Sequence, residues 1–307
     1  NGQNSYILHS VAVGFECGQE YMGNGVDNQG SSQNTLVGYR SASKIRNSKW
    51  LIAIGDSAVG GRHSKCVGGD SSHINSSSCT TAGHSWASGS TTIGQGQIGI
   101  GYQALDRVGT GQYNIGIGHQ AGQFIQFNAF ENIAIGKSSL GSSVTACQNT
   151  NYANQTDCEN GGSTWGYIMT ANSNVALGTN TLGKVFDGNE NIAIGKNAFN
   201  QHAKGSSNVA IGSHAGAESR YSSYDVYVGR EAGYGLKTSQ GVNNSNVMVG
   251  YKAGRSSRIR HRNTFIGTQA GIYLNQNGSG NNSTNNTFLG FNAGTQLSSY
   301  QTTTYSN

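Results

Sequence analysis

The chain has 307 residues, of which 35% are hydrophobic and only 11% are charged, with 47 glycines, no proline and a net charge of +5. A typical soluble domain carries about twice that share of charged residues, so the composition is unlike that of a cytosolic enzyme. It would suit a disordered chain, except that the apolar residues recur at fixed positions.

A short apolar pattern that ends in glycine recurs along the whole chain. Its thirteen terminal glycines are Gly14, Gly38, Gly55, Gly101, Gly118, Gly136, Gly178, Gly195, Gly212, Gly229, Gly250, Gly267 and Gly290. Consecutive copies are never closer than 17 residues, and the longer steps are insertions. Because a loop can bulge out between coils but a coil cannot be shortened, this spacing predicts stacked coils.

Each copy predicts one short strand immediately before its glycine. In chain order these strands are 11–13, 35–37, 52–54, 98–100, 115–117, 133–135, 175–177, 192–194, 209–211, 226–228, 247–249, 264–266 and 287–289. The first residue of each is β-branched and the third is aliphatic, and alternation places both on one side of the strand. We interpret them as an inward core ladder, represented by Ile115, Ile117, Ile133, Ile135, Val175, Leu177, Ile192, Ile194, Val209 and Ile211.

The middle residue of each predicted strand points to the opposite side. It is alanine or glycine in most of the early and middle copies and becomes large near the C-terminus, as in Tyr227, Met248 and Phe265. A plain solvent-exposed face would carry Thr, Lys or Gln, so we interpret this side as a second packing surface against another chain. The alternative is a surface strip without a role.

An asparagine precedes most of the predicted strands. We expect a hydrogen-bonded ladder along the stack from Asn114, Asn132, Asn174, Asn191, Asn208, Asn246, Asn263 and Asn286. The glycine after each strand permits a positive φ, and the small residue that follows it indicates a corner and a second short strand. No period of 3.6 residues is visible. The fold class predicted is therefore all-β: one domain over residues 1–307, a parallel β-solenoid or β-roll of about 13 coils.

Two insertions, at approximately 60–95 and 141–170, are predicted to be surface loops. Each holds two cysteines, and a tryptophan follows the second cysteine by seven residues. The cysteines are Cys66 and Cys79 in the first loop and Cys147 and Cys158 in the second. We predict one disulfide within each loop, worth roughly 3 kcal/mol for a loop of this size, and therefore an oxidising extracellular location.

Zinc is the alternative for the first loop, because His63, His73 and His84 lie near its cysteines. Structural zinc sites usually place their cysteines two to four residues apart, and this loop does not. The fifth cysteine, Cys17, occupies a position where other copies have alanine, and we expect it to be a buried free thiol.

Three stretches, "NVAIGSHAG", "NIAIGKNAF" and "NTFLGFNAG", resemble the repeats in head regions of trimeric autotransporter adhesins. They resemble equally the Asn-Thr-x-x-Gly-x-x-Ala-Gly repeats of phage and viral tail fibres. The likeness spans roughly Val11 to Gly294 and implies a left-handed parallel β-roll with three chains side by side. The 17-residue period is longer than that of adhesin heads, and the stalk, anchor and C-terminal chaperone of those families are not seen. The trimer is implied by the resemblance only.

Chemistry-bearing residues are scattered over different coils. We predict no catalytic, cofactor-binding or metal-binding residue and no cofactor, because the fourteen acidic residues show no paired arrangement. A basic turn holds Arg255, Arg258, Arg260 and Arg262. It could contact a polyanion such as an acidic polysaccharide, or it could serve solubility alone; nucleic acid is the less favoured partner.

These features together predict an extracellular structural or adhesive fibre subunit on a cell or virion surface. We expect the chain to self-associate, as a homotrimer or a head-to-tail filament, and to display its loops to a cell-surface glycan or matrix ligand. Deleting residues 1–9 should then abolish filament growth. No apolar run approaches 18 residues, so no membrane span is expected. Because residue 1 is Asn rather than Met, we interpret the chain as processed or as a fragment.

Three other functions compete with this one. A phage or viral tail fibre that binds a receptor is the main alternative. An ice-binding solenoid needs a regular threonine array, but threonine occupies the same repeat position only at Thr35, Thr264 and Thr287. A glycan-degrading solenoid needs a cluster of acidic residues that the sequence does not show.

Overall fold

The computed structural model describes residues 9–18, 33–43, 48–60, 65–67, 85–87, 94–106, 111–123, 125, 129–141, 145–147, 165–167, 171–185, 188–202, 205–219, 222–236, 243–257, 259, 261–274 and 284–295. The chain divides into two compact units, Asn1–Ala129 and Phe130–Asn307. Each unit is described by itself below.

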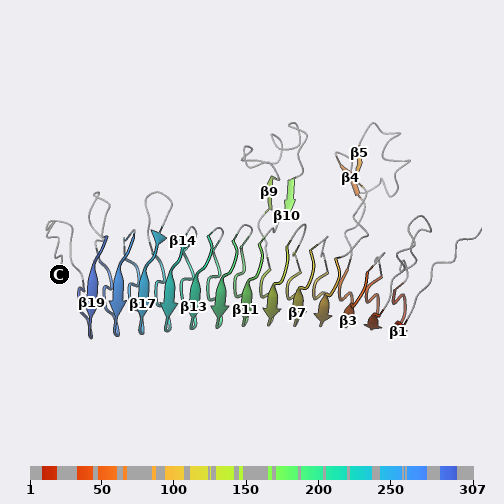
Figure 1. Ribbon diagram of the computed structural model, residues 1–307, viewed down its shortest axis with the longest axis horizontal. Coiled ribbons are helices and arrows are strands. Elements are labelled where there is room, and N and C mark those ends of the chain that lie inside the picture. The colour runs from red at the N-terminus through yellow and green to blue at the C-terminus, as the bar shows by residue number, and fades with distance from the viewer. Residues whose placement is uncertain are drawn as a thin grey trace, which may run out of the picture. The chain divides into compact units, whose positions relative to one another are not determined.

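The first unit stacks five short strands in parallel. They are β1 (Val11–Val13), β2 (Thr35–Val37), β3 (Ile52–Ile54), β6 (Ile98–Ile100) and β7 (Ile115–Ile117), and each pairs with the next (Figure 1). Equivalent residues face each other without a slip, so Ile98 lies opposite Ile115 and Ile100 opposite Ile117.

The second unit stacks eight more strands in the same way. They are β8 (Ile133–Ile135), β11 (Val175–Leu177), β12 (Ile192–Ile194), β13 (Val209–Ile211), β15 (Val226–Val228), β17 (Val247–Val249), β18 (Thr264–Ile266) and β19 (Thr287–Leu289). Ile194 lies opposite Ile211, as the 17-residue spacing predicts. Thirteen parallel strands at this spacing confirm the predicted β-solenoid and its all-β class.

Each insertion contains a pair of antiparallel strands. In the first, β4 (Lys65–Val67) pairs with β5 (Ser85–Ala87), and in the second, β9 (Thr145–Cys147) pairs with β10 (Trp165–Tyr167). The backbone places Cys66 opposite Trp86 and Cys147 opposite Trp165, so the two insertions share one register. Cys79 and Cys158 lie outside the described residues, as do the side chains of the other two cysteines, so both disulfides stay predictions.

The second strand predicted in each coil is replaced by a turn. Residues one to four after the glycine form turns in every coil except that of Gly55, as at Gly195, because the chain bends there through left-handed residues. Two-residue strands do form farther along two coils, where β14 (Ser222–Ser223) pairs with β16 (Asn243–Asn244).

The core lies on the side of the strands opposite to the one predicted. The middle strand residue is buried in each stacked strand from β2 to β18, for example Ala193, Tyr227 and Phe265 at 0% exposure. The predicted inward ladder faces outward, and none of its members is buried: Ile115, Ile117, Ile133, Ile135, Val175, Leu177, Ile192, Ile194, Val209 and Ile211. The register of the ladder is correct, but the prediction that it faces inward was wrong, because the middle strand residues and the turn residues, such as Ala193 and Phe199, already fill the interior.

In most coils, side-chain volume is shared between two positions six residues apart. Where the middle strand residue is Ala193, the turn supplies the buried Phe199. Where the strand supplies Phe265, the turn has Gly271, and a Cβ there would lie 2.6 Å from the Phe265 ring. Cores are packed too tightly for both positions to be large. This exchange explains why the middle residues become larger toward the C-terminus.

At least four described residues per coil have a positive φ. Around β12 these are Glu190 (φ 59), Gly195 (φ 122), Asn197 (φ 58) and Phe199 (φ 47), and other coils repeat the same four places. A Cβ on Gly195 would lie 2.8 Å from the carbonyl carbon and oxygen of Gly212 in the next coil. The prediction that this glycine supplies a positive φ is confirmed, and close stacking adds a second requirement.

Hydrogen bonds between successive coils confirm the predicted asparagine ladder from Asn132 to Asn208 and from Asn246 to Asn286, with Asp225 between the two stretches. Asn191 Nδ2 donates to Asn174 Oδ1 at 3.0 Å, and Asn208 Nδ2 donates to Asn191 Oδ1 at 2.9 Å. Asn263 and Asn286 continue the ladder with bonds of 3.0 Å and 2.9 Å. Asn174 Oδ1 and Asn191 Oδ1 also accept the backbone N–H of the next asparagine, so these buried amides are satisfied between coils.

Candidate functional site

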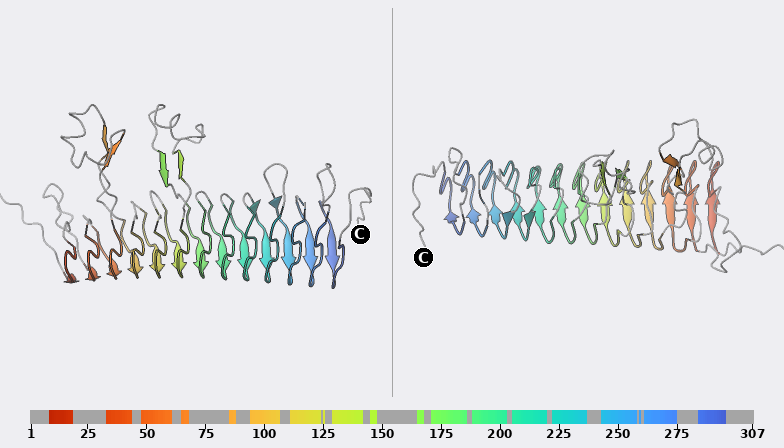
Figure 2. Two further views of the ribbon diagram at one scale, coloured as in Figure 1. Left: turned by 180° about the vertical axis from the view of Figure 1, so that it is seen from behind. Right: turned by 90° about the horizontal axis from the view of Figure 1, so that it is seen from above.

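The outward side of the second unit forms a continuous apolar surface. We call it the aliphatic face; it consists of the first and third residues of β8, β11, β12, β13, β15, β17, β18 and β19. These sixteen side chains comprise fourteen aliphatic residues and two threonines, and none of them is buried. Figure 2 shows the parallel strands that carry them.

Side chains of the aliphatic face contact one another but leave their outer surfaces bare. Ile192 and Ile211 are each 38% exposed and Ile266 is 39% exposed, although equivalent residues of adjacent strands lie directly opposite. Isolated exposed apolar residues need no explanation, whereas a contiguous patch of several hundred Å² marks an interaction surface. The aliphatic face is therefore the candidate site of this protein.

Two polar rims border the aliphatic face, because parallel strands begin along one edge and end along the other. The start rim comprises the residues two positions before each strand: Glu131, Ser173, Glu190, Ser207, Tyr224, Ser245, Arg262 and Asn285. The end rim comprises the residues two positions after each strand: Lys137, Thr179, Lys196, Ser213, Arg230, Tyr251, Thr268 and Phe291. All start-rim residues have a positive φ, a feature that the sequence analysis missed.

The acidic and basic members of the rims are exposed. Ser173 Oγ donates to Glu131 Oε2 at 3.3 Å, and Ser207 Oγ donates to Glu190 Oε2 at 3.0 Å, so each glutamate is held by the next coil. Lys137 and Lys196 are exposed, and neither takes part in an ion pair with another described residue.

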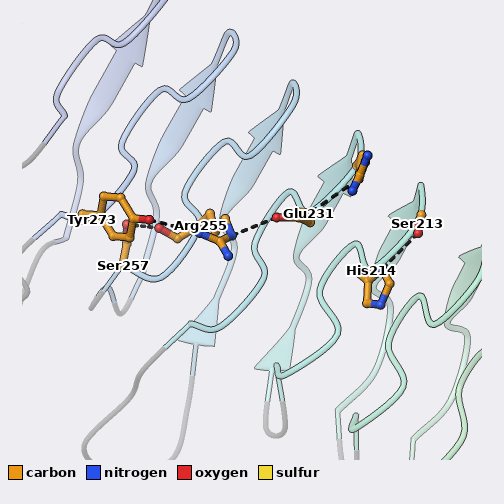
Figure 3. A network of polar contacts seen from close by, with 7 residues as sticks. Ser213, His214, Glu231, Arg255, Ser257 and Tyr273 are labelled. Carbon is orange, nitrogen blue, oxygen red and sulfur yellow. Dashed lines mark hydrogen bonds and ion pairs between the residues drawn. The ribbon is translucent and has the colours of Figure 1, made fainter.

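A polar network crosses the turns next to the end rim and includes Arg230 of that rim, whose Nε lies 3.4 Å from Glu231 Oε1 (Figure 3). Arg255 Nε lies 2.9 Å from Glu231 Oε2, and Arg255 Nη1 donates to Tyr273 Oη at 3.1 Å. The guanidinium of Arg255 also lies over the Tyr234 ring at 5.6 Å from its centroid. Ser213 Oγ and His214 Nδ1, 2.9 Å apart, lie on a neighbouring coil of the same view.

The structure does not gather the predicted polyanion-binding arginines into one described cluster. Arg255 is held by Glu231 and Tyr273, whereas Arg262 lies exposed on the start rim before β18. Arg258 and Arg260 lie outside the described residues.

Buried titratable groups lie inside the coils rather than at the candidate site. Tyr227 donates to Asp225, and burial raises the pKa of Asp225 to about 6 and that of Tyr227 well above its ordinary value. Burial lowers the pKa of His202. Cys17 is half-buried and free, and burial raises the pKa of its thiol.

Within the described ranges, no three His, Cys, Asp or Glu side chains gather as a metal site would require. No described helix is long and apolar enough to cross a membrane. Comparisons with protein-family models, with curated proteins and with solved structures find no match to this chain.

Proposed function

We propose that this chain is an extracellular fibre subunit that self-associates side by side through the aliphatic face. One observation carries the proposal: eight successive strands each direct two outward side chains, mostly valine and isoleucine, into a surface on which none is buried.

Covering this face would supply free energy of the same order as the cost of association. Full burial of an aliphatic side chain is worth about 1.5–3 kcal/mol, so the exposed third of each is worth roughly 0.5–1 kcal/mol. Summed over the face this is of order 10 kcal/mol, which must offset an association cost of about 4–15 kcal/mol. The sixteen face residues and sixteen rim residues match the roughly 20–30 residues that a standard interface contributes from each side.

A second copy of the chain is the partner that fits the face best. The aliphatic face repeats at the strand spacing of about 4.8 Å, and a partner must offer apolar groups at the same spacing over eight strands. Another copy meets that requirement at every coil. Three copies is the number implied by the resemblance to the heads of trimeric autotransporter adhesins.

The insertions support an extracellular and adhesive role. Their shared cysteine and tryptophan register is that of two equivalent modules, and two disulfides would suit a secreted protein. In this proposal the insertions contact a cell-surface glycan or a matrix ligand. A phage or viral tail fibre that binds a receptor remains the second candidate, because the same repeat architecture occurs in such fibres.

Light scattering coupled to size exclusion tests the self-association. We expect the purified chain to be a homo-oligomer and the double variant Ile192→Ser/Ile211→Ser to be a monomer with an unchanged far-UV circular dichroism spectrum. Tyr273→Ser is the matched control, because Tyr273 is 36% exposed but lies outside the face. A wild-type chain that stays monomeric at 100 µM would overturn the proposal.

A further inference from the structure

We infer that Glu131 and Glu190 of one copy pair with Lys137 and Lys196 of the neighbouring copy, so that the copies lie parallel and in register. This inference rests on the proposed self-association through the aliphatic face. It names the residues that decide how two copies meet.

The heptapeptide "ENIAIGK" occurs twice in the second unit, at 131–137 and at 190–196. In both coils it places a glutamate on the start rim and a lysine on the end rim, and all four charged residues are exposed. The strand Ile192–Ile194 lies between the two charges of the second heptapeptide, so Glu190 and Lys196 stand on opposite rims. Among the described residues, no ion pair joins them.

A closed ring of copies brings these charges together. When copies are related by an axis parallel to the direction of stacking, the start rim of one copy faces the end rim of its neighbour at the same coil. Glu131 then meets Lys137 of the neighbour, and Glu190 meets Lys196. The other six coils bring Ser173 to Thr179, Ser207 to Ser213, Tyr224 to Arg230, Ser245 to Tyr251, Arg262 to Thr268 and Asn285 to Phe291.

None of these eight encounters brings two like charges together, and one of them faces Tyr224 with the cation of Arg230. A neighbouring copy with its stack running in the opposite direction would instead place its start rim against the start rim of the first copy. If such a copy were centred on β11, the coil of Glu131 would meet the coil of Glu190, and two carboxylates would face each other. A shift by one coil would set Glu190 against Thr179 or Ser213 and lose both ion pairs.

The aliphatic face cannot make this choice by itself. Valine and isoleucine repeat almost uniformly from β8 to β18, so sliding one face along another changes the apolar contact little. Charged pairs at a rim are worth only a few-fold in affinity each, but complementary charges fix the register and exclude wrong arrangements. The charged residues of the two heptapeptides therefore determine which coils of neighbouring copies lie opposite each other.

Charge reversal and exchange test the inference. The acid-reversed variant is Glu131→Lys/Glu190→Lys, the base-reversed variant is Lys137→Glu/Lys196→Glu, and the exchanged variant carries all four substitutions. By sedimentation velocity in 50 mM NaCl, we expect each reversed variant to self-associate about tenfold or more weakly than the wild type, and the exchanged variant to match it. In 500 mM NaCl the differences should shrink, because salt screens exposed charges.

Mixtures and controls sharpen the result. Fluorescently labelled exchanged chains should co-assemble with wild-type chains more weakly than with one another, whereas a mixture of acid-reversed and base-reversed chains should assemble more tightly than either variant alone. Lys184→Glu/Lys252→Glu changes the net charge as much as the base reversal but lies off both rims, and it should assemble normally. Circular dichroism checks that every variant is folded.

Two outcomes separate this inference from the proposal on which it rests. If the wild-type chain is monomeric, the proposed self-association is wrong. If the wild-type chain assembles and the reversed variants assemble equally well at low salt, the ion pairs are wrong while the self-association stands. Failure of the folded exchanged variant to assemble would also overturn the inference.

Discussion

Tyr227 donates its phenolic hydrogen to Asp225 Oδ2 over 2.7 Å, and both side chains are fully buried inside their coil. Asp225 stands in the asparagine ladder, where its Oδ1 accepts the backbone and side-chain N–H groups of Asn246 at 2.7 Å and 3.1 Å. These bonds lower the pKa of Asp225, but burial outweighs them and raises it from 3.8 to about 6.

Asp225 should therefore make the protein less stable as the pH rises from about 4 to 6. The native state holds this proton more tightly than the unfolded chain does, so stability is present below the unfolded pKa and is lost through the folded pKa. We expect Asp225→Asn to raise the free energy of unfolding at pH 7 by roughly 1–3 kcal/mol and to remove this fall. Urea denaturation at half-unit pH steps measures the free energy of unfolding. If the stability of Asp225→Asn still falls between about pH 4 and 6, Asp225 is not the group responsible.

His202 should have the opposite effect on the pH dependence. Its Nδ1 lies 2.9 Å from the Ser219 carbonyl and its Nε2 lies 3.3 Å from the Gly205 carbonyl, and burial lowers its pKa. Because the unfolded chain binds the proton more readily, stability should fall as the pH drops below about 6.5. In the Asp225→Asn background we expect this fall to be visible, and His202→Gln should abolish it. An unchanged acid limb in the His202→Gln variant would disprove the role of His202.

The glycine ladder predicts a difference between two identical substitutions. Gly195→Ala places a Cβ 2.8 Å from the backbone of Gly212, whereas a Cβ on Gly290 meets nothing within 4 Å. Both glycines have nearly the same φ, 122° and 124°, so both variants carry the same conformational cost. We expect Gly195→Ala to lower the free energy of unfolding by at least about 2 kcal/mol more than Gly290→Ala. Thermal denaturation measures both, and equal losses would exclude the steric contribution.

The orientation of the strand side chains predicts a difference between an inward and an outward substitution. Ala193→Leu forces extra volume into a site that Phe199 already fills, and it should cost roughly 1–3 kcal/mol or more. Ile192→Ser changes a half-exposed position and should destabilise the monomer by less than the core substitution does. Both should be compared in a variant that does not self-associate. The reverse order would restore the inward ladder that the sequence analysis predicted.

Peptide mapping under non-reducing conditions tests the two insertions. We expect the peptides of Cys66 and Cys147 to be linked to those of Cys79 and Cys158 respectively. A thiol reagent applied to the denatured, unreduced chain should then label Cys17 alone. Labelling of all five cysteines would exclude the disulfides and weaken the extracellular assignment.

The strand positions, the register and the asparagine ladder could be predicted because each depends on the 17-residue period. The inward side could not be predicted from alternation, which distinguishes two sides without saying which has room for large residues. The informative pattern is the size of two residues six positions apart. The small Ala193 is followed by the large Phe199, and the large Phe265 is followed by Gly271. Comparing those two positions in every copy would have shown that they are never both large.

The left-handed residues and the rims were missed for a different reason. Glu190 and Tyr224 have no chemistry in common, yet both have a positive φ. Stacking imposes that conformation, because Glu190 N–H donates to the Asn172 carbonyl of the preceding coil at 2.9 Å. Residue type gives little indication of a backbone state that neighbouring coils enforce.

The in-register pairing of equivalent residues has a consequence for how such a gene can change. Loss of residues 174–190 would bring β8 beside β12, where Ile133 would meet Ile192 as it now meets Val175. Recombination between repeats could therefore remove or add whole coils in single events, and most of the remaining contacts would be kept. Selection could therefore change the number of coils one at a time, without the many compensating substitutions that a change of size requires in a globular protein.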